Sequence, residues 1–218
     1  TPTRTTTQTP TITPTWSVTP SVTPIQSNDL SDEVLADSPW AYYKLNDSGP
    51  SGITDSSGNG RNLPQTYGTP DYGSMGLFSG SGTSVWFNGV NERVWGEYPI
   101  DVLTAFDGDK AYTLEAVVNS IGEGTIIHIG NYGMPNAQGF WLSRTADGNI
   151  ATGAFTGSWT SIVSTSQPIT DNESYIITAT REIGGTVCLY VNGELVHTGS
   201  LGSLRTADPG NISIGSST

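Results

Sequence analysis

Cysteine and histidine are nearly absent from this chain, and their scarcity excludes several kinds of site. Cys188 is the single cysteine in 218 residues, so an internal disulfide framework and a zinc site built from several thiolates are both excluded. His128 and His197 are the only histidines, which excludes a metal site of three histidines and leaves a Ser-His-Asp site only two candidate bases. Stability therefore has to come from the burial of an apolar core.

Positive charge is also scarce. The chain carries 8 Lys and Arg against 20 Asp and Glu, a formal net charge of −12 with histidine neutral. Binding to nucleic-acid phosphates needs a basic stripe, whereas the basic residues here are scattered singly, so we expect neither nucleic acid nor a membrane surface as a partner. The longest apolar runs, such as 125–130, fall far short of the roughly 20 residues of a membrane-spanning helix.

Charged residues of the kind that surface helices use are few, while turn-forming residues are abundant. Charged residues make up 13% of the chain, which contains 27 glycines and 13 prolines. Surface helices are rich in Lys, Glu and Arg, whereas short strands joined by tight turns are rich in Gly, Pro and Asn. The composition therefore predicts an all-β protein with many turns.

Residues 1–28 form a segment of their own, rich in Thr and Pro, in which Arg4 is the only charged residue. Proline favours extended backbone and denies hydrogen-bond donors, so this segment predicts a semi-rigid stalk or docking arm. We expect it to make most of the chain's contacts with other structural subunits, with a homotrimer as one arrangement. Its apolar contact residues are Ile12, Trp16, Val18 and Val22. A disordered linker is the alternative.

Residues 29–218 are predicted to form one sandwich domain. Residues 29–37 have the pattern of a short helix with Ser31 as its N-cap, and Asn192-Gly193 is a strong signal for a two-residue hairpin. Short alternating segments then predict two packed antiparallel sheets. The expected strands are 41–45, 84–87, 93–95, 112–119, 125–129, 140–144, 150–155, 161–164, 175–181, 187–191, 194–198 and 211–214. The expected core includes Leu45, Phe87, Leu114, Ala116, Val118, Ile177, Leu189 and Val191.

Several short motifs occur in a characteristic order. They are WAYYKLND at 40–47, DSSGNGRNL at 55–63, SVWFNG at 84–89, YTLEAVVNS at 112–120 and LYVNG at 189–193. Together they resemble the laminin-G-like, concanavalin A-like jelly-roll superfamily, which implies an antiparallel jelly-roll sandwich over about residues 40–215. The resemblance also implies a further closing strand. Either the protein continues or that strand comes from elsewhere. We expect a domain truncated before its last strand, because an unpaired edge invites aggregation.

The sequence lacks the common catalytic patterns. The resemblance implies that a glycoside hydrolase of this fold would carry a Glu-x-Asp-x-x-Glu strand, and no such run occurs here. Asp107 and Asp109 are the nearest carboxylate pair, and turn capping accounts for them. Neither histidine lies beside a Gly-x-Ser-x-Gly elbow, and Lys44 and Lys110 lack a phosphate-binding loop. We therefore expect a protein that is not an enzyme.

Calcium is the one cofactor that the resemblance suggests, because several laminin-G-like domains hold it with loop oxygens. Loop oxygens of suitable hardness belong to Asp55, Asn59, Asp107, Asp109, Asp147 and Asn149. Their spacing matches no EF-hand loop, and the capping of turns is the alternative role for each. We predict no cofactor, with calcium as the alternative.

Aromatic side chains are the remaining signal of a binding site. Lectin sites stack sugar rings on Trp and Tyr. The candidate ligand-binding residues are Trp95, Trp141 and Trp159, together with the strand carboxylate Glu115. Burial in the core or at a sheet edge is the alternative for each Trp, and Trp86 is expected beside the core next to Phe87.

These features lead to one functional expectation and two alternatives. We expect a non-catalytic display domain of a virion, such as a phage fibre or capsid decoration, or of an extracellular structural protein, that binds a glycan or a host surface. Fold analogy alone carries the glycan part. The alternatives are a carbohydrate-binding module of a secreted hydrolase and a purely architectural subunit without a ligand.

Overall fold

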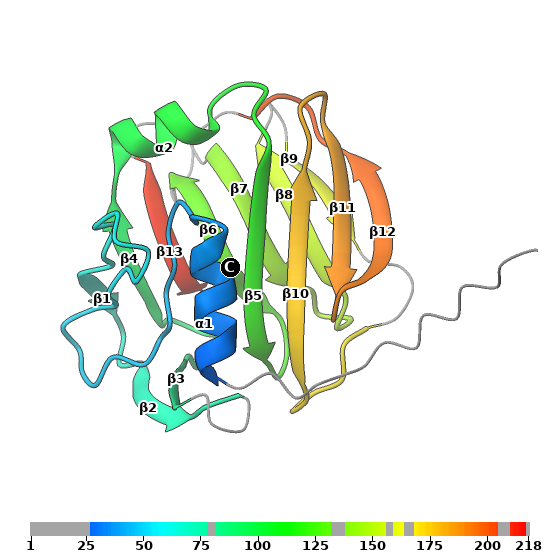
Figure 1. Cartoon of the computed structure of the whole chain (residues 1–218). Helices are drawn as coiled ribbons and strands as arrows, with labels where there is room; N and C mark the ends of the chain where they lie inside the picture. Colours follow the sequence, from blue (N-terminus) through cyan, green and yellow to red (C-terminus); the bar gives the residue numbers. More distant parts are fainter. Residues whose placement is uncertain are drawn as a thin grey trace, which may run out of the picture.

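The computed structural model describes residues 27–77, 82–131, 138–155, 159–163, 168–204 and 210–216. Within them, two antiparallel sheets pack face to face as a sandwich (Figure 1), which confirms the predicted all-β, two-sheet fold. The four apolar residues predicted for the arm, Ile12, Trp16, Val18 and Val22, lie outside the described residues, so their docking role stays a prediction.

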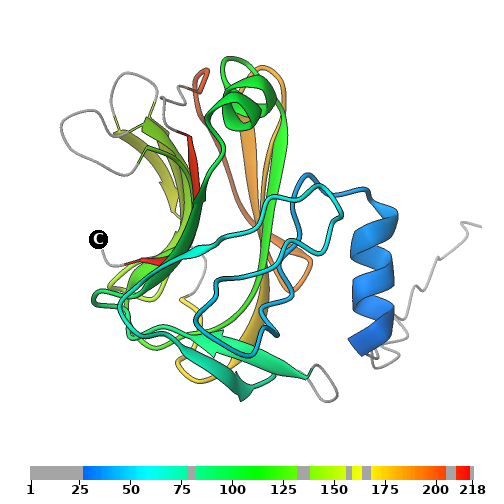
Figure 2. The ribbon, with the colours of Figure 1, turned by 90° about the vertical axis from the view of Figure 1, so that its left-hand side faces the viewer.

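The larger sheet has seven strands in the order β1-β4-β13-β6-β7-β8-β9. Its strands are β1 (Gln65–Tyr67), β4 (Arg93–Glu97), β13 (Asn211–Ser216), β6 (Gly124–Asn131), β7 (Gln138–Arg144), β8 (Ile150–Phe155) and β9 (Trp159–Val163). Strand β13 comes last along the described chain, yet it pairs with both β4 and β6. The sheet is curved, and Figure 2 shows its hollow side turned away from the other sheet.

The smaller sheet has four strands in the order β12-β11-β10-β5. They are β5 (Tyr112–Asn119), β10 (Ser174–Arg181), β11 (Thr186–Val191) and β12 (Glu194–Ser200). Asn192 and Gly193 join β11 to β12 with φ values of 51° and 80°, the two positive angles that a type I′ turn requires, so the predicted hairpin is confirmed.

Two helices and a small hairpin complete the described chain. The hairpin consists of β2 (Asp71–Met75) and β3 (Thr83–Trp86), and the helices are α1 (Ser27–Ala36) and α2 (Pro99–Phe106). The N-cap prediction for Ser31 was wrong, because α1 begins at Ser27 and places Ser31 inside the helix, with its hydroxyl 3.3 Å from that of Tyr42. Neither helix is long and apolar enough to cross a membrane, and the described chain contains no other.

The predicted strand at 41–45 does not form. Tyr43 makes only an isolated bridge with Asp55, and Leu45 has a φ of 56°, a left-handed conformation that interrupts extended backbone. The other predicted strands are present with small shifts at their ends, while β1, β2 and α2 were not predicted.

The core lies between the two sheets and confirms the predicted strand faces. Leu114 is 6% exposed, and Ile177 and Leu189 are fully buried. The remaining predicted core residues pack against this cluster as half-buried side chains: Leu45, Phe87, Ala116, Val118 and Val191. Trp86 is a correction, because it is 54% exposed on β3, whose neighbouring residue Val85 supplies the contact with the core.

A buried arginine ties the ends of several strands together. Arg181 is 2% exposed, and its guanidinium donates to Asp109 Oδ1 at 3.0 Å and to the Gly202 carbonyl at 2.9 Å. Asp109 also accepts a hydrogen bond from the Gly184 N–H at 3.0 Å. The Gly184 hydrogen bond, followed by the Arg181 interaction, lowers the pKa of Asp109. The Asp109 oxygens, expected to cap a turn or bind calcium, therefore serve Arg181.

Replacing Arg181 by Met should destabilise the fold strongly. The substitution keeps most of the buried volume but leaves the carbonyls of Gly202 and Lys110 without their donor, at a cost of about 3 kcal/mol in the free energy of unfolding. Urea unfolding followed by tryptophan fluorescence measures this loss. Lys110→Met, which changes an exposed side chain in the same region, is the control and should cost little.

Candidate functional site

A straight row of paired residues crosses the outer, hollow face of the larger sheet. Trp95 on β4 pairs with Ser213 on β13, which pairs in turn with His128 on β6. Trp141 on β7 follows as the partner of His128. Directly paired residues point to the same side of a sheet. The neighbours of this row along the strands are core residues, namely Val94, Ile212, Ile129 and Leu142. This Trp95–Trp141 row therefore faces away from the core, on the side that is hollow in Figure 2.

Two of the three predicted tryptophans are thus brought onto one surface. Trp95 and Trp141 are both half-buried and stand three strands apart, roughly 14 Å at the usual strand spacing of about 4.8 Å. Trp159 belongs to β9 of the same sheet, where it pairs with Phe155. The structure describes its backbone but not its side chain. Glu115 lies elsewhere, exposed on β5 of the smaller sheet, where it accepts a hydrogen bond from Thr178 Oγ1 at 2.8 Å.

Buried polar atoms lie between the two tryptophans. Ser213 is 4% exposed, and its Oγ has no hydrogen-bond partner among the residues that the structure describes. Asn211 lies two residues earlier on β13 and on the same face. Its Oδ1 is also buried and has no hydrogen-bond partner among the described residues. A buried polar atom without a partner is costly, so both atoms keep a hydrogen-bonding capacity that the described residues do not use.

His128 occupies the middle of the row as a neutral side chain. It is 4% exposed, and its burial, followed by the positive charge of Arg93, lowers its pKa to about 4. Arg93 lies two residues before Trp95 on β4, and its guanidinium is 5.7 Å from the centre of the Tyr67 ring. At neutral pH the row therefore presents an uncharged imidazole beside the Ser213 hydroxyl.

Glycines lie beside and beyond Trp141, and Gly139 and Gly153 are themselves buried. Gly153 on β8 pairs with Trp141 and extends the row without a side chain. In the adjacent row, Gly139 pairs with Gly130 at a φ of 128°, and a Cβ at Gly139 would lie 2.1 Å from the Ile129 carbonyl oxygen. The close approach of β6 and β7 therefore requires glycine.

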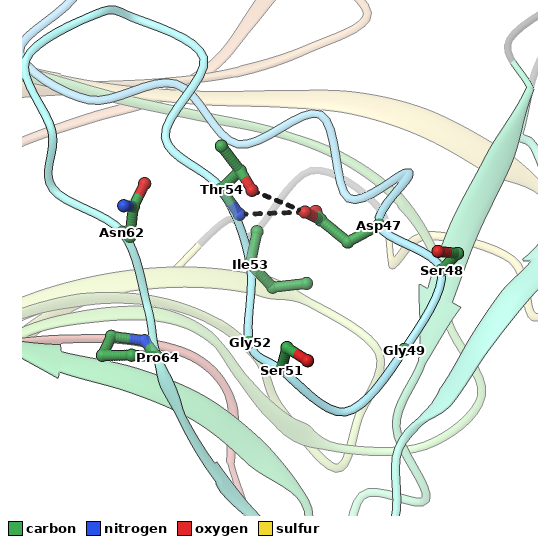
Figure 3. Close-up of a pocket in the computed structure, with 9 residues that line it drawn as sticks. All are labelled: Asp47, Ser48, Gly49, Ser51, Gly52, Ile53, Thr54, Asn62 and Pro64. Carbon is green, nitrogen blue, oxygen red and sulfur yellow. Dashed lines mark hydrogen bonds between the residues drawn. The ribbon is translucent and has the colours of Figure 1, made fainter.

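A pocket of about 480 Å³ lies elsewhere, in the loops before β1 (Figure 3). Its lining residues are Asp47, Ser48, Gly49, Ser51, Gly52, Ile53, Thr54, Asn62 and Pro64. Asp47 is the single carboxylate among them, and its Oδ1 accepts hydrogen bonds from the Thr54 N–H at 3.2 Å and the Thr54 hydroxyl at 2.8 Å. Because this carboxylate holds the loop together and no aromatic ring lines the hollow, it is a weaker candidate than the row.

The turn that follows Asp55 uses its oxygens internally. The Asp55 carboxylate accepts hydrogen bonds from the N–H groups of Tyr42 at 3.0 Å, Ser57 at 2.9 Å and Arg61 at 2.9 Å. Burial acts to raise the pKa of Asp55, but hydrogen bonds from Ser57, Tyr42 and Arg61 outweigh it and lower the pKa. Two of the carboxylates considered as calcium ligands, Asp55 and Asp109, are therefore engaged by protein donors.

Chelation should leave the stability of this protein unchanged. The described part of the chain contains no group of three His, Cys, Asp or Glu side chains placed to hold a metal ion. Thermal unfolding with EDTA and with added calcium should therefore give the same midpoint. A midpoint that falls by several degrees in EDTA and recovers with calcium would show that a metal binds the native state.

Comparison with known proteins identifies the family. Residues 97–218, more than half of the chain, match the family model of the concanavalin A-like lectin/glucanases superfamily. The chain belongs to this superfamily. This confirms the resemblance drawn from the sequence motifs, although the match begins after the motifs at 40–47, 55–63 and 84–89. No curated protein matches the chain.

Several solved structures with a similar fold are binding domains. The receptor-binding domain of botulinum neurotoxin C/D mosaic serotype is 20% identical with a TM-score of 0.55, over 82% of this chain and 43% of the toxin domain. The binding domain of Paraclostridial Mosquitocidal Protein 1 gives 18% and 0.56, over 83% and 44%. This chain spans less than half the length of either binding domain.

A third similar structure is close to this chain in length. Domain 4 of AbnA, an extracellular arabinanase from Geobacillus stearothermophilus, was solved in complex with arabinotriose. It is 18% identical with a TM-score of 0.55, over 81% of this chain and 82% of that domain. At these identities the similarity establishes the sandwich fold.

The buried neutral state of His128 predicts a pH dependence of stability. Its pKa is about 4 in the folded chain against 6.5 for the ordinary group, so the unfolded chain binds more protons between these values. Folding stability should therefore fall as the pH drops from 6.5 towards 4, by about 2 to 3 kcal/mol for this group alone. Urea unfolding at pH 7.0, 5.5 and 4.5 measures the loss.

The variant His128→Gln should flatten this pH dependence, because glutamine does not titrate. His197→Gln is the matched control, since it removes the other histidine from the half-buried surface of β12. An equal pH dependence in the parent protein and in His128→Gln would contradict the assignment of the titrating group.

Proposed function

We propose that this chain is a glycan-binding domain without catalytic activity and that the Trp95–Trp141 row is its binding face. The observation that carries the proposal is the position of Ser213, whose buried hydroxyl lies between two half-buried tryptophans on one sheet surface. Indole rings stack against the apolar faces of sugars, while polar atoms between them hydrogen-bond the sugar hydroxyls. The fold similarity to an arabinanase domain solved with arabinotriose supports the same ligand class.

The geometry favours an extended oligosaccharide that lies across the strands. The two indole rings are separated by three strand spacings, roughly 14 Å, which exceeds the size of one sugar ring. Beyond Trp141 the row continues over Gly153 to Ser161 without a bulky side chain at Gly153. A chain of several sugars bound along the row would stack on both rings and pass over Ser213 between them.

The absence of catalysis is proposed from the carboxylates of the described strands. Glycoside hydrolysis uses two carboxyl groups about 5 to 9.5 Å apart across the scissile bond. Among the described residues in and beside the Trp95–Trp141 row, Glu97 supplies the single carboxylate, at the end of β4. Glu115 lies on the other sheet, so no second carboxylate from these strands faces Glu97. The face is therefore suited to hold a glycan rather than to cleave it.

The setting that fits such a domain is an exposed surface. We place it on a virion, as part of a phage fibre or capsid decoration, or on an extracellular structural protein, with residues 1–28 attaching it to other subunits. A carbohydrate-binding module of a secreted hydrolase is the second candidate, and the similarity to domain 4 of an extracellular arabinanase favours it specifically. Both candidates share the same binding face.

Replacing Trp95 or Trp141 by Ala should weaken glycan binding without unfolding the protein. Loss of one stacking ring is expected to raise the dissociation constant about ten- to hundred-fold, equivalent to about 1.4 to 2.8 kcal/mol. A glycan array finds the ligand, and isothermal titration calorimetry with the best oligosaccharide measures the change. Arabinotriose is a suitable first probe.

Trp86→Ala is the matched control, because it removes a 54% exposed tryptophan that lies on β3, outside the larger sheet. It should leave the dissociation constant unchanged. Ser213→Ala should weaken binding with little effect on the thermal midpoint. If no glycan on the array binds the parent protein, the domain is architectural, and equal losses in all three tryptophan variants would remove the row from the site.

A further inference from the structure

The smaller sheet has an open edge along β5. Strand β5 pairs with β10 over its full length, and no other described strand lies beside it. At this edge Ala116 and Val118 are only half-buried, although they belong to the core-facing side together with the buried Leu114. A further strand beside β5 would cover both side chains.

The backbone groups at this edge can be identified from the pairing. Ile176 on β10 turns towards β11, since its carbonyl accepts from the Asn192 N–H at 2.7 Å and its N–H donates to Asn192 Oδ1 at 2.9 Å. Successive residues of a strand direct their N–H and C=O groups to opposite edges, so Ile177 bonds its β5 partner Ala116. The groups left at the open edge therefore belong to the alternate residues of β5: Thr113, Glu115, Val117 and Asn119.

The Thr/Pro arm carries a strict two-residue alternation. Every odd position from Thr9 to Thr23 is Thr or Ser. Every even position from Pro10 to Pro24 is apolar: Pro10, Ile12, Pro14, Trp16, Val18, Pro20, Val22 and Pro24. Alternation of this kind is typical of a strand with one buried face.

The prolines of this arm leave all backbone N–H groups in place along one of its two edges. Proline has no N–H, and all prolines from Pro10 to Pro24 occupy even positions. In an extended strand the even residues direct their backbone groups to one edge and the odd residues to the other. Only the edge made by the Thr and Ser residues keeps every donor, so the arm is suited to pair on that side alone.

We propose that residues 9–24 of a second copy of this chain add to the open edge of β5 as an antiparallel strand. In antiparallel pairing, residues whose backbone groups face each other lie directly opposite and share a face. The Thr and Ser residues of the arm then lie opposite Thr113, Glu115, Val117 and Asn119 on the outer side. The apolar residues, including Trp16 and Val18, then lie on the core side beside Ala116 and Val118.

The same parity argues against the chain's own arm as the occupant. Helix α1 begins at the end of the sandwich where β5 finishes (Figure 1), so an arm that leads into α1 along β5 would run parallel to it. In parallel pairing, the Thr and Ser residues of the arm, which keep all their N–H groups, lie opposite the β5 residues that bond β10. Those β5 residues face the core. Thr and Ser would then face the core and Trp16 the outside. A neighbouring copy has no such constraint on direction.

This inference deepens the assembly role proposed for the arm, on which it rests, and is independent of glycan binding. A contact between the arm of one copy and the sheet of the next is heterologous, because the two surfaces differ. Such contacts close into a ring or continue as a fibre. Each copy gains a strand and loses an exposed edge, which also guards the protein against unspecific strand pairing.

A pair of proline substitutions in the arm tests the proposal. Ser17→Pro removes a donor from the pairing edge, while Val18→Pro places a proline at an even position, as already occurs at Pro14 and Pro20. Ser17→Pro should raise the dissociation constant of the full-chain assembly about ten-fold or more, as expected for a lost backbone hydrogen bond, and Val18→Pro should do so much less. Sedimentation velocity across a concentration series measures both. Equal effects, or a monomeric parent protein, would overturn the proposal.

A second pair of variants tests the receiving edge. Val117→Pro removes an N–H from the open edge of β5, and Thr198→Pro changes an exposed position on β12, the opposite edge strand of the same sheet. Only Val117→Pro should dissociate the assembly, provided that circular dichroism shows both variants folded. If Val117→Pro does not fold, a synthetic peptide of residues 9–24 replaces it: it should compete with the parent assembly, and the same peptide with Ser17→Pro should not. Glycan titration of each protein variant keeps the two proposals separate. A variant that loses assembly but still binds glycan bears on the assembly proposal and leaves the glycan-binding proposal intact.

Discussion

The register that joins β4, β13, β6 and β7 is the constraint on which the binding face depends. A shift of β13 by one residue would turn Ser213 into the core and Ile212 out to the hollow side, because side chains alternate along a strand. The core prevents this shift, since Ile212 is 2% exposed and Val94 is fully buried. Burial on the inner side of the sheet therefore fixes which groups meet on the outer side, so the core stabilises the fold and sets the site together.

Local signals in the sequence were sufficient for much of the fold. Strands β5 and β8 were predicted with their observed bounds, because alternation and flanking turn residues mark them within a few positions. Helix α2 was missed, although Pro99 at its first position and Asp101 in its first turn are ordinary signals of a helix start. The segment 41–45 reads as a strand, but the positive φ of Leu45 and its place outside both sheets depend on tertiary contacts that the segment does not encode.

The site was only partly accessible from the sequence. Tryptophan is a recognisable candidate for sugar stacking, so Trp95 and Trp141 were identified by residue type alone. Ser213 and His128 were not, because their place between the tryptophans follows from the pairing of β13 with β4 and β6, strands far apart in the chain. Glu115 lies on the other sheet, but nothing near it in the sequence shows which sheet its strand joins. It was therefore grouped with the tryptophans.

The central position of β13 also bears on how the chain acquires its structure. Along the chain, β6 is the next strand of the larger sheet after β4. The two do not pair with each other, because the strand at 211–216 lies between them in the sheet. On the ribosome, the two strands emerge long before the segment that joins them. Until then each exposes an unsatisfied edge and an apolar face, which makes the nascent chain prone to aggregation. Contacts between such distant segments also slow folding, because a long loop must close before they form. The strand that places Ser213 in the site is therefore the one whose late arrival limits completion of the larger sheet.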